Sequence, residues 1–156
     1  MVFAIIGENC TGKSTLASEL KKAVGGEIVS GRDYYRLAKS EAEAEAVFKK
    51  KLSEAVTGEN VIYVITEPRH TGLLPEGAVK ILASADLDTV KERFKARMNG
   101  VLPPPVAAML EKKHGVFDGG VYDYRYDGAK GDPAAAAEEI KILVSSKESG
   151  NEANQR

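Results

Sequence analysis

Short apolar runs alternate with amphipathic segments along most of the chain. The runs at 2–6 (VFAII), 61–65 (VIYVI) and 78–85 (AVKILASA) are apolar almost throughout. That pattern is typical of strands buried on both faces of a parallel sheet. Shorter runs at 27–30 (EIVS) and 121–127 (VYDYRYD) complete a set of five predicted strands.

The amphipathic segments between these runs predict helices. From Leu16 to Val24 apolar residues recur at helical spacing, and Gly25 and Gly26 then end the helix. Residues 34–57 also follow a helical pattern and include the stretch SEAEAEA, which has high helix propensity. We therefore expect one long helix over that segment.

Two further helices are predicted in the second half of the chain. Residues 86–98 (DLDTVKERFKARM) are amphipathic, with Asp86 or Asp88 available as the N-cap. Residues 132–146 form a closing helix, with Asp132 as N-cap and a proline in the first turn. Strands that alternate with helices indicate parallel strands joined by right-handed crossovers. The sequence thus predicts a three-layer α/β/α sandwich around a mostly parallel five-stranded sheet.

One segment breaks this alternation. Residues 98–120 contain three consecutive prolines and several glycines around a short helical stretch. A long, partly irregular segment in a compact domain is usually a lid or a binding loop. The last residues, 147–156, have no apolar anchor, and we expect them to be disordered. We interpret 1–146 as a single domain.

Composition excludes several classes of partner. The 156 residues carry 22 Lys and Arg against 23 Asp and Glu, so there is no large basic field to hold a nucleic-acid backbone. No run approaches the roughly 18 apolar residues needed to span a bilayer. The single cysteine, Cys10, cannot form an internal disulfide, which favours a reducing compartment. We expect a cytoplasmic protein with no nucleic-acid or membrane partner, and its oligomeric state is left open.

A phosphate-binding motif lies directly after the first predicted strand. Residues 7–14 read GENCTGKS and fit the pattern G-x-x-x-x-G-K-[ST]. The glycines let backbone N–H groups point at one anion, the lysine reaches the terminal phosphates, and the hydroxyl ligates Mg²⁺. A buried strand before the motif and a helix after it are the context that the motif requires. The predicted nucleotide-binding residues are Gly7, Glu8, Asn9, Cys10, Thr11, Gly12, Lys13, Ser14 and Thr15.

Residues 2 to about 144 resemble the small P-loop kinases of nucleosides, nucleotides and similar metabolites, such as the adenylate and guanylate kinases. The other segments that carry the resemblance are SGRDYYR (30–36), TEPRH (66–70), ERFKAR (92–97) and YDYRYDGAKGDP (122–133). The resemblance implies ATP and Mg²⁺ as cofactors and a small-molecule acceptor. It also implies a helical acceptor-side segment at 34–58 and a lid at 98–120.

On the donor side, ERFKAR is similar to the arginine pair that leads into the lid of nucleoside monophosphate kinases. The resemblance implies that Arg93 packs against the adenine and that Arg97 contacts the transferring phosphates. The two residues are four apart and share one helix face. The last segment is similar to a base-binding loop, in which Asp127, Gly128 and Ala129 would line the adenine. A plain strand-to-helix turn is an equally consistent interpretation.

On the acceptor side, SGRDYYR resembles two different kinds of kinase. In the adenylate kinase pattern, Arg36 would bind the phosphate of the acceptor. In the nucleoside and sugar kinase pattern, Asp33 would accept the proton of the attacking hydroxyl. A helix N-cap is a third interpretation of Asp33. After the next predicted strand, Arg69 would hold an acceptor phosphate and Glu67 would hold Mg²⁺ through water, unless TEPRH is an ordinary strand-end turn.

Two features depart from these kinases. The connection at 66–78 is too short for the usual acceptor-side helix. The lid carries Lys112, Lys113 and His114 in place of an arginine-rich pattern, and we interpret His114 as an exposed lid residue and not as a catalytic base. These departures bear on the identity of the acceptor and leave the phosphate loop unaffected.

The preferred hypothesis is transfer of the γ-phosphate of ATP to a nucleoside monophosphate, because Arg36 and Arg69 follow two strand ends. The candidate catalytic residues are Lys13, Asp33, Arg93 and Arg97, and the candidate metal-binding residues are Ser14 and Glu67. One alternative is a kinase of a small alcohol (a nucleoside, a sugar or a shikimate-like acid) that uses Asp33 as base. The other is a nucleotide-binding regulatory protein or slow ATPase without an acceptor.

Overall fold

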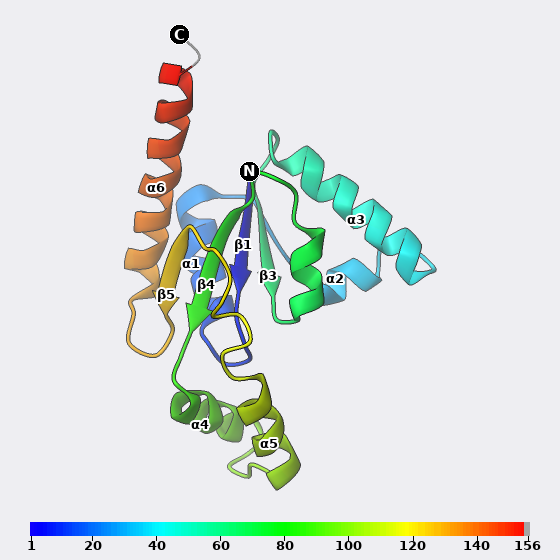
Figure 1. Ribbon diagram of the computed structural model, residues 1–156, viewed down its shortest axis with the longest axis vertical. Coiled ribbons are helices and arrows are strands. Elements are labelled where there is room, and N and C mark those ends of the chain that lie inside the picture. The colour runs from blue at the N-terminus through cyan, green and yellow to red at the C-terminus, as the bar shows by residue number, and fades with distance from the viewer. Residues whose placement is uncertain (155–156) are drawn as a thin grey trace.

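The computed structural model describes residues 1–154, without the side chains of residue 32 and of residues 147–154. Within this part of the chain one five-stranded sheet has the order β2-β3-β1-β4-β5, and every neighbouring pair is parallel (Figure 1). The strands are β1 (Val2–Ile6), β2 (Glu27–Ser30), β3 (Val61–Ile65), β4 (Val79–Ser84) and β5 (Tyr124–Asp127). The prediction of a mostly parallel five-stranded sheet is confirmed.

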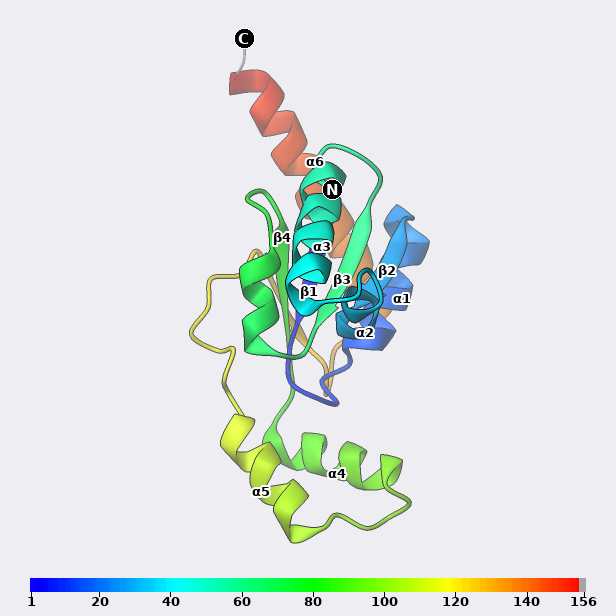
Figure 2. The same cartoon turned by 90° about the vertical axis from the view of Figure 1, so that its right-hand side faces the viewer.

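Helices connect the strands and cover both faces of the sheet. They are α1 (Lys13–Val24), α2 (Gly31–Tyr35), α3 (Glu41–Ala55), the 3₁₀ helix η1 (Pro68–Leu73), α4 (Leu87–Arg97), α5 (Pro104–Lys113) and α6 (Pro133–Asn154). Helices α1 and α6 pack together on one face of the sheet, and α2, α3 and η1 lie on the other (Figures 1 and 2). The three-layer α/β/α arrangement is therefore also confirmed.

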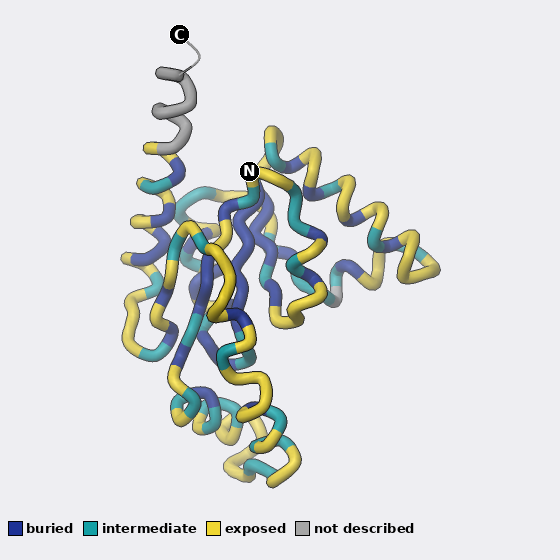
Figure 3. The backbone as a smooth tube through the Cα atoms, viewed as in Figure 1, coloured by how far each residue is buried: buried dark blue, intermediate teal, exposed yellow. Residues whose placement is uncertain are grey.

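Alternation along the central strand explains the two layers of core. Ala4 and Ile6 of β1 belong to the cluster that includes Phe48 of α3. Phe3 and Ile5 point to the other face and belong to the cluster that includes Leu16 of α1. Because side chains alternate along a strand, an apolar strand of this kind supplies both cores at once. Figure 3 shows the resulting band of buried residues along the strands.

The long helix predicted over 34–57 is wrong, because the chain forms two helices there. Helix α2 ends at Tyr35, and α3 begins at Glu41 after Ser40, whose side chain accepts a hydrogen bond from the backbone N–H of Glu43 at 3.2 Å. Ser40 and Glu43 match the S-x-x-E pattern of a helix N-terminus. Helical periodicity continues across this boundary, so periodicity alone did not reveal it.

The C-terminal helix is longer than predicted. Helix α6 continues through Asn154, into the segment 147–156 for which we predicted disorder, and residues 155–156 lie outside the described residues. At its start Asp132 Oδ1 accepts the backbone N–H of Ala134 at 3.0 Å, as expected of the predicted N-cap. No helix in the described part of the chain is both long enough and apolar enough to cross a membrane.

The segment predicted to be a lid lies beyond the carboxyl ends of the strands (Figures 1 and 2). Helix α4 leaves β4 with Asp86 as its N-cap, since the Asp86 carboxylate accepts the N–H of Thr89. Helix α5 begins at Pro104, with Pro103 as its N-cap, and Leu110 of α5 packs with Val90 of α4 in a small separate core. Helices α4 and α5 are thus held together by a core of their own, which includes Cys10 of the phosphate loop.

Candidate functional site

The phosphate loop joins the central strand β1 to helix α1. Gly7 donates its N–H to Ile65 O at 3.1 Å, so the loop starts where β1 and β3 end. A Cβ atom on Gly7 would lie 2.3 Å from the carbonyl oxygen of Ala83 and 2.7 Å from Thr11 Oγ1. Glycine is therefore required here by the close approach of β4 and of the loop itself.

The loop then curls so that helix α1 starts inside it. Cys10 and Gly12 have positive φ angles of 64° and 85°, in the left-handed region that glycine adopts most readily. This curl brings the first turn of α1 back toward the start of the loop, with Ser14 and Thr15 exposed there. Unpaired N–H groups and the helix dipole favour an anion at such a helix start.

Lys13 is buried at the centre of this loop. Its side chain is 7% exposed, and its ammonium group donates a hydrogen bond to the backbone carbonyl oxygen of Glu8. Burial lowers the pKa of Lys13 to about 8, and the nearby charge of Arg97 adds to this effect, whereas the charges of Cys10 and Glu8 oppose it. An anion in the loop would give the buried ammonium the opposite charge that it lacks. The loop therefore fits a phosphate group.

Arg93 joins the phosphate loop to the loop after β5. Its Nη1 donates to Cys10 O at 3.1 Å and its Nη2 donates to Gly128 O at 2.7 Å. The two loops are in close contact, because a Cβ on Gly128 would lie 1.8 Å from the carbonyl oxygen of Thr11. The structure thus brings the predicted base-binding residues against the phosphate loop, with Arg93 half-buried between them.

The turn after β5 is itself held by the Asp127 carboxylate. Asp127 Oδ1 accepts the backbone N–H groups of Ala129 at 2.9 Å and Lys130 at 3.2 Å. The aspartate side chain therefore shapes the turn, while Gly128 provides the contact with the phosphate loop. Arg97, one helical turn beyond Arg93, is exposed.

Asp33 lies in the first turn of α2, at the carboxyl end of β2. Its Oδ2 accepts the backbone N–H of Ser30 at 2.8 Å and the hydroxyl of Ser30 at 3.3 Å. Ser30 is the N-cap of α2, and Asp33 is the third helical residue in a capping box. Asp33 thus contributes to capping, although not as the N-cap residue that the sequence suggested.

Arg69 is surrounded by acidic and aromatic side chains. Its Nε donates to Glu67 Oε2 at 2.7 Å and its Nη1 lies 3.4 Å from Glu41 Oε1, while Nη2 donates to the hydroxyl of Tyr35. The hydrogen bond that Arg69 donates to Glu67 and the nearby carboxylates raise the pKa of Arg69. Arg36 is exposed, and within the described residues its side chain has no hydrogen bond or ion pair.

Two buried polar groups on this side were not predicted as site residues. Tyr63 of β3 is 0% exposed and His70 of η1 is 6% exposed, and neither Tyr63 Oη nor His70 Nε2 has a hydrogen-bond partner within the described residues. Burial lowers the pKa of His70, against the nearby charge of Glu67, which raises it. Its Cε1 lies 3.1 Å from where a Cβ of Gly31 would be, at the start of α2. The histidine is visible in TEPRH, but nothing in the sequence indicates that it is buried.

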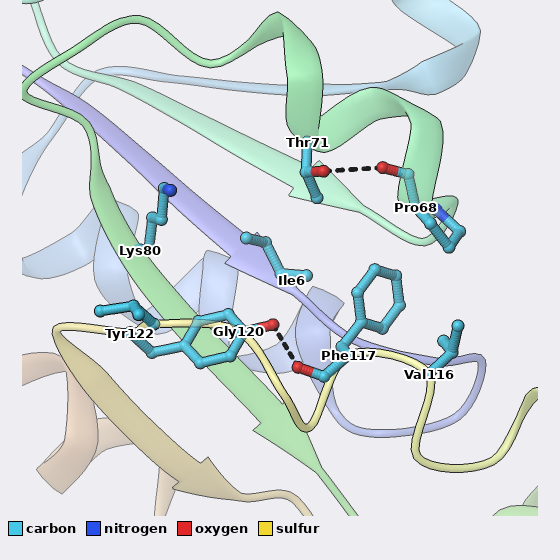
Figure 4. Close-up of a pocket in the computed structure, with 9 residues that line it drawn as sticks. Ile6, Pro68, Thr71, Lys80, Val116, Phe117, Gly120 and Tyr122 are labelled. Atoms are coloured by element: carbon cyan, nitrogen blue, oxygen red, sulfur yellow. Dashed lines mark hydrogen bonds between the residues drawn. The ribbon is translucent and has the colours of Figure 1, made fainter.

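A cavity of about 240 Å³ lies beside the end of β1, between η1 and residues 116–122, which follow α5 (Figure 4). It is lined by Ile6, Pro68, Thr71, Lys80, Val116, Phe117, Gly120, Val121 and Tyr122. The short connection between β3 and β4 accounts for it, because η1 covers less of the sheet than a full helix would. The walls are mainly apolar, and Lys80 brings the one cationic side chain among them.

The predicted donor-side residues lie together at the ends of three strands, whereas the predicted acceptor-side residues lie after two other strands. The phosphate loop, Arg93 and residues 127–129 meet at the ends of β1, β4 and β5. Asp33 and Arg69 follow β2 and β3. No group of three or more His, Cys, Asp or Glu side chains in the described part of the chain could hold a metal ion by itself.

Solved structures with this architecture include several kinases. The chain is similar to a gluconokinase from Sinorhizobium meliloti 1021 (TM-score 0.67, 13% identity, covering 99% of this chain and 97% of that one). It is also similar to a shikimate kinase from Acinetobacter baumannii in complex with shikimate (TM-score 0.64, 14% identity, covering 94% and 93%). The chain therefore shares its fold with these kinases.

A third similar structure is a deoxyadenosine kinase from M. mycoides, with a TM-score of 0.57, 21% identity and coverage of 94% of this chain and 100% of that one. At sequence identities this low, the TM-scores show a shared fold. No model of a known protein family matches the sequence, and no curated protein matches it.

Proposed function

We propose that the chain is an ATP- and Mg²⁺-dependent kinase that phosphorylates a hydroxyl group of a small molecule. The observation that carries the proposal is the buried ammonium of Lys13, which faces a carbonyl oxygen of its own loop and lacks an anionic partner there. Arg93 and the residues after β5 lie directly against the same loop. The fold shared with kinases of gluconate, shikimate and deoxyadenosine supports the same reaction class.

In this proposal the phosphate loop binds the donor phosphates. Lys13 and the backbone N–H groups of residues 8–15 hold the β- and γ-phosphates, and the exposed hydroxyl of Ser14 is a ligand for Mg²⁺. Bound Mg²⁺ would neutralise charge on the phosphate oxygens. Arg97 stabilises charge on the transferring group, while Arg93 keeps the adenine-side loop in place through its bonds to Cys10 and Gly128.

The acceptor is proposed to be an alcohol, with Asp33 as the base that takes its proton. Both hydrogen bonds from Ser30 are accepted by Asp33 Oδ2, and within the described residues Oδ1 is left for a hydroxyl. The same bonds fix the carboxylate at the carboxyl edge of the sheet, where ligands of such sheets bind. The three kinases compared above are named for molecules that carry hydroxyl groups.

The nucleoside monophosphate acceptor is the second candidate. Arg69 favours it, because an exposed arginine after β3 is placed to meet an anionic group. The ion pairs with Glu67 and Glu41, however, offset the positive charge that a phosphate would need. For Glu67 the pair with Arg69 competes with the proposed water-mediated contact to Mg²⁺. The hydroxyl acceptor is therefore preferred.

ATP consumption with Mg²⁺ over a panel of acceptors tests the proposal. The panel contains polyols and hydroxy acids, nucleosides and nucleoside monophosphates, with a control that lacks any acceptor. Stimulation by alcohols, lost in Asp33→Asn, is the expected result. Stimulation by monophosphates alone would indicate that Arg69, and not Asp33, is the residue that interacts with the acceptor. Tight ATP binding without stimulation by any member would refute the kinase and leave a nucleotide-binding protein.

A further inference from the structure

The backbone and the side chain of Glu8 contact different parts of the molecule. Its carbonyl oxygen accepts the ammonium of Lys13 and the hydroxyl of Thr11, the latter at 2.9 Å, inside the phosphate loop. Its carboxylate instead meets the end of the lid. Oε1 accepts the backbone N–H of Gly115 at 3.1 Å, and Oε2 lies 3.3 Å from Nδ1 of His114.

A carboxylate is unexpected in a loop that binds phosphate. A negative side chain repels the anion that the loop is shaped to hold, so it lowers nucleotide affinity unless it is directed elsewhere. Here the Glu8 side chain is 12% exposed and points to a lid segment more than a hundred residues away in the sequence. The hydrogen bond from a backbone N–H to a carboxylate is stronger than one to a neutral acceptor. Contact with the lid accounts for the glutamate at this position.

The contact continues from Gly115 into the wall of the cavity. Gly115 has a φ angle of 79°, and its carbonyl oxygen accepts the N–H of Asp118 at 3.0 Å. Within the turn that follows, the carbonyl oxygen of Phe117 accepts the N–H of Gly120 at 3.2 Å and the hydroxyl of Tyr122 at 2.6 Å (Figure 4). Phe117 is buried and, with Tyr122, lines the cavity.

We infer that Glu8 is a positioning residue that couples the phosphate loop to the cavity beside Ile6 by holding the lid segment at Gly115. The inference rests on the proposed function in assuming that the cavity is part of the site for a small acceptor. Arg93 of α4, just before the lid segment, contacts the same loop through Cys10. The phosphate loop thus holds the chain both before the lid segment and within it, at Gly115. The position of the cavity wall formed by Phe117 and Tyr122 therefore depends on residue 8.

Hydrogen exchange on the full chain without ligand tests the coupling directly. In Glu8→Ala, amides of residues 110–122 should exchange roughly tenfold faster, the range expected for a lost hydrogen bond to a charged group. Glu8→Gln keeps an oxygen for the Gly115 N–H and should recover most of the protection. Glu111→Ala is the matched control, because Glu111 pairs with Lys91 inside the lid and does not touch the phosphate loop. Its exchange at 114–122 should equal that of the wild type.

Exchange that is unchanged in Glu8→Ala, or equally raised in Glu111→Ala, would overturn the inference. Because hydrogen exchange is measured without turnover, it tests the coupling separately from the proposed kinase activity. Once an acceptor is found, Glu8→Ala should raise its KM about tenfold and change the KM of ATP by less than about threefold, with rescue by Glu8→Gln. A change confined to the KM of ATP would show instead that Glu8 acts only on the donor.

Discussion

The close contact between Gly128 and the phosphate loop predicts that a methyl group at position 128 will separate the two loops. In Gly128→Ala the added Cβ would lie 1.8 Å from the carbonyl oxygen of Thr11 and 2.6 Å from its carbonyl carbon. Both atoms are backbone, so no side-chain rotation relieves the overlap. The two loops must separate, and the bond from Arg93 Nη2 to Gly128 O, now 2.7 Å, is stretched with them.

The expected cost follows from overpacking of a closely packed site. Such insertions destabilise proteins by about 1–3 kcal/mol, and replacing glycine by alanine returns about 0.4–1 kcal/mol by restricting the unfolded chain. Gly119→Ala is the control, because nothing lies within 4 Å of its added Cβ and only the unfolded-state effect remains. Gly128→Ala should therefore be about 2 kcal/mol less stable than Gly119→Ala, which is a Tm difference of about 4–8 °C for a domain of this size.

Thermal unfolding and ATP titration of the two variants measure both effects. ATP affinity should fall at least about tenfold in Gly128→Ala, because the loop that is displaced forms one side of the proposed nucleotide site. Gly119→Ala should bind ATP as the wild type does. Equal Tm values and equal ATP affinities for the two variants would refute the packing argument and the assignment of residues 127–129 to the nucleotide site.

Three further predictions concern other parts of the chain. Because the pKa of Lys13 is about 8 in the folded state and 10.5 in the unfolded state, the unfolded chain binds more protons between these values. The free energy of unfolding should therefore rise from pH 8 to pH 10.5 more steeply in the wild type than in Lys13→Met, as measured by urea denaturation; parallel profiles would contradict this. Asp33→Asn preserves an acceptor for the Ser30 N–H, so turnover should fall about 10²–10⁴-fold with ATP affinity within about threefold of the wild type, measured by coupled assay and titration. Loss of stability without loss of turnover would restrict Asp33 to its capping role. Ser40→Ala removes the N-cap of α3 and should cost about 1 kcal/mol, whereas Ser53→Ala, exposed within α3, should stay within about 0.5 kcal/mol in the same unfolding assay.

The sequence by itself determined the features that depend on short-range patterns. Apolar runs such as 2–6 and 61–65 became buried strands, because a strand buried on both faces must be apolar at nearly every position. The phosphate loop was equally predictable, since its glycines, Lys13 and the start of α1 lie within eight consecutive residues. An aspartate N-cap for α4 was also predicted, with Asp86 and Asp88 both possible, and the structure shows that it is Asp86.

Tertiary structure decided what depends on contacts between distant segments. Nothing in the sequence near Gly128 indicates that Thr11 lies against it, and nothing near Glu8 indicates that its carboxylate meets Gly115. The break between α2 and α3 lies between these cases, because its local signal at Ser40 competes with a helical periodicity that continues through it. Strands, caps and the phosphate loop are predictable from local patterns because the residues that identify each of them lie close together in the sequence. The pairing of loops, the burial of His70 and the cavity beside Ile6 arise only once the parallel sheet brings separate strand ends to one edge.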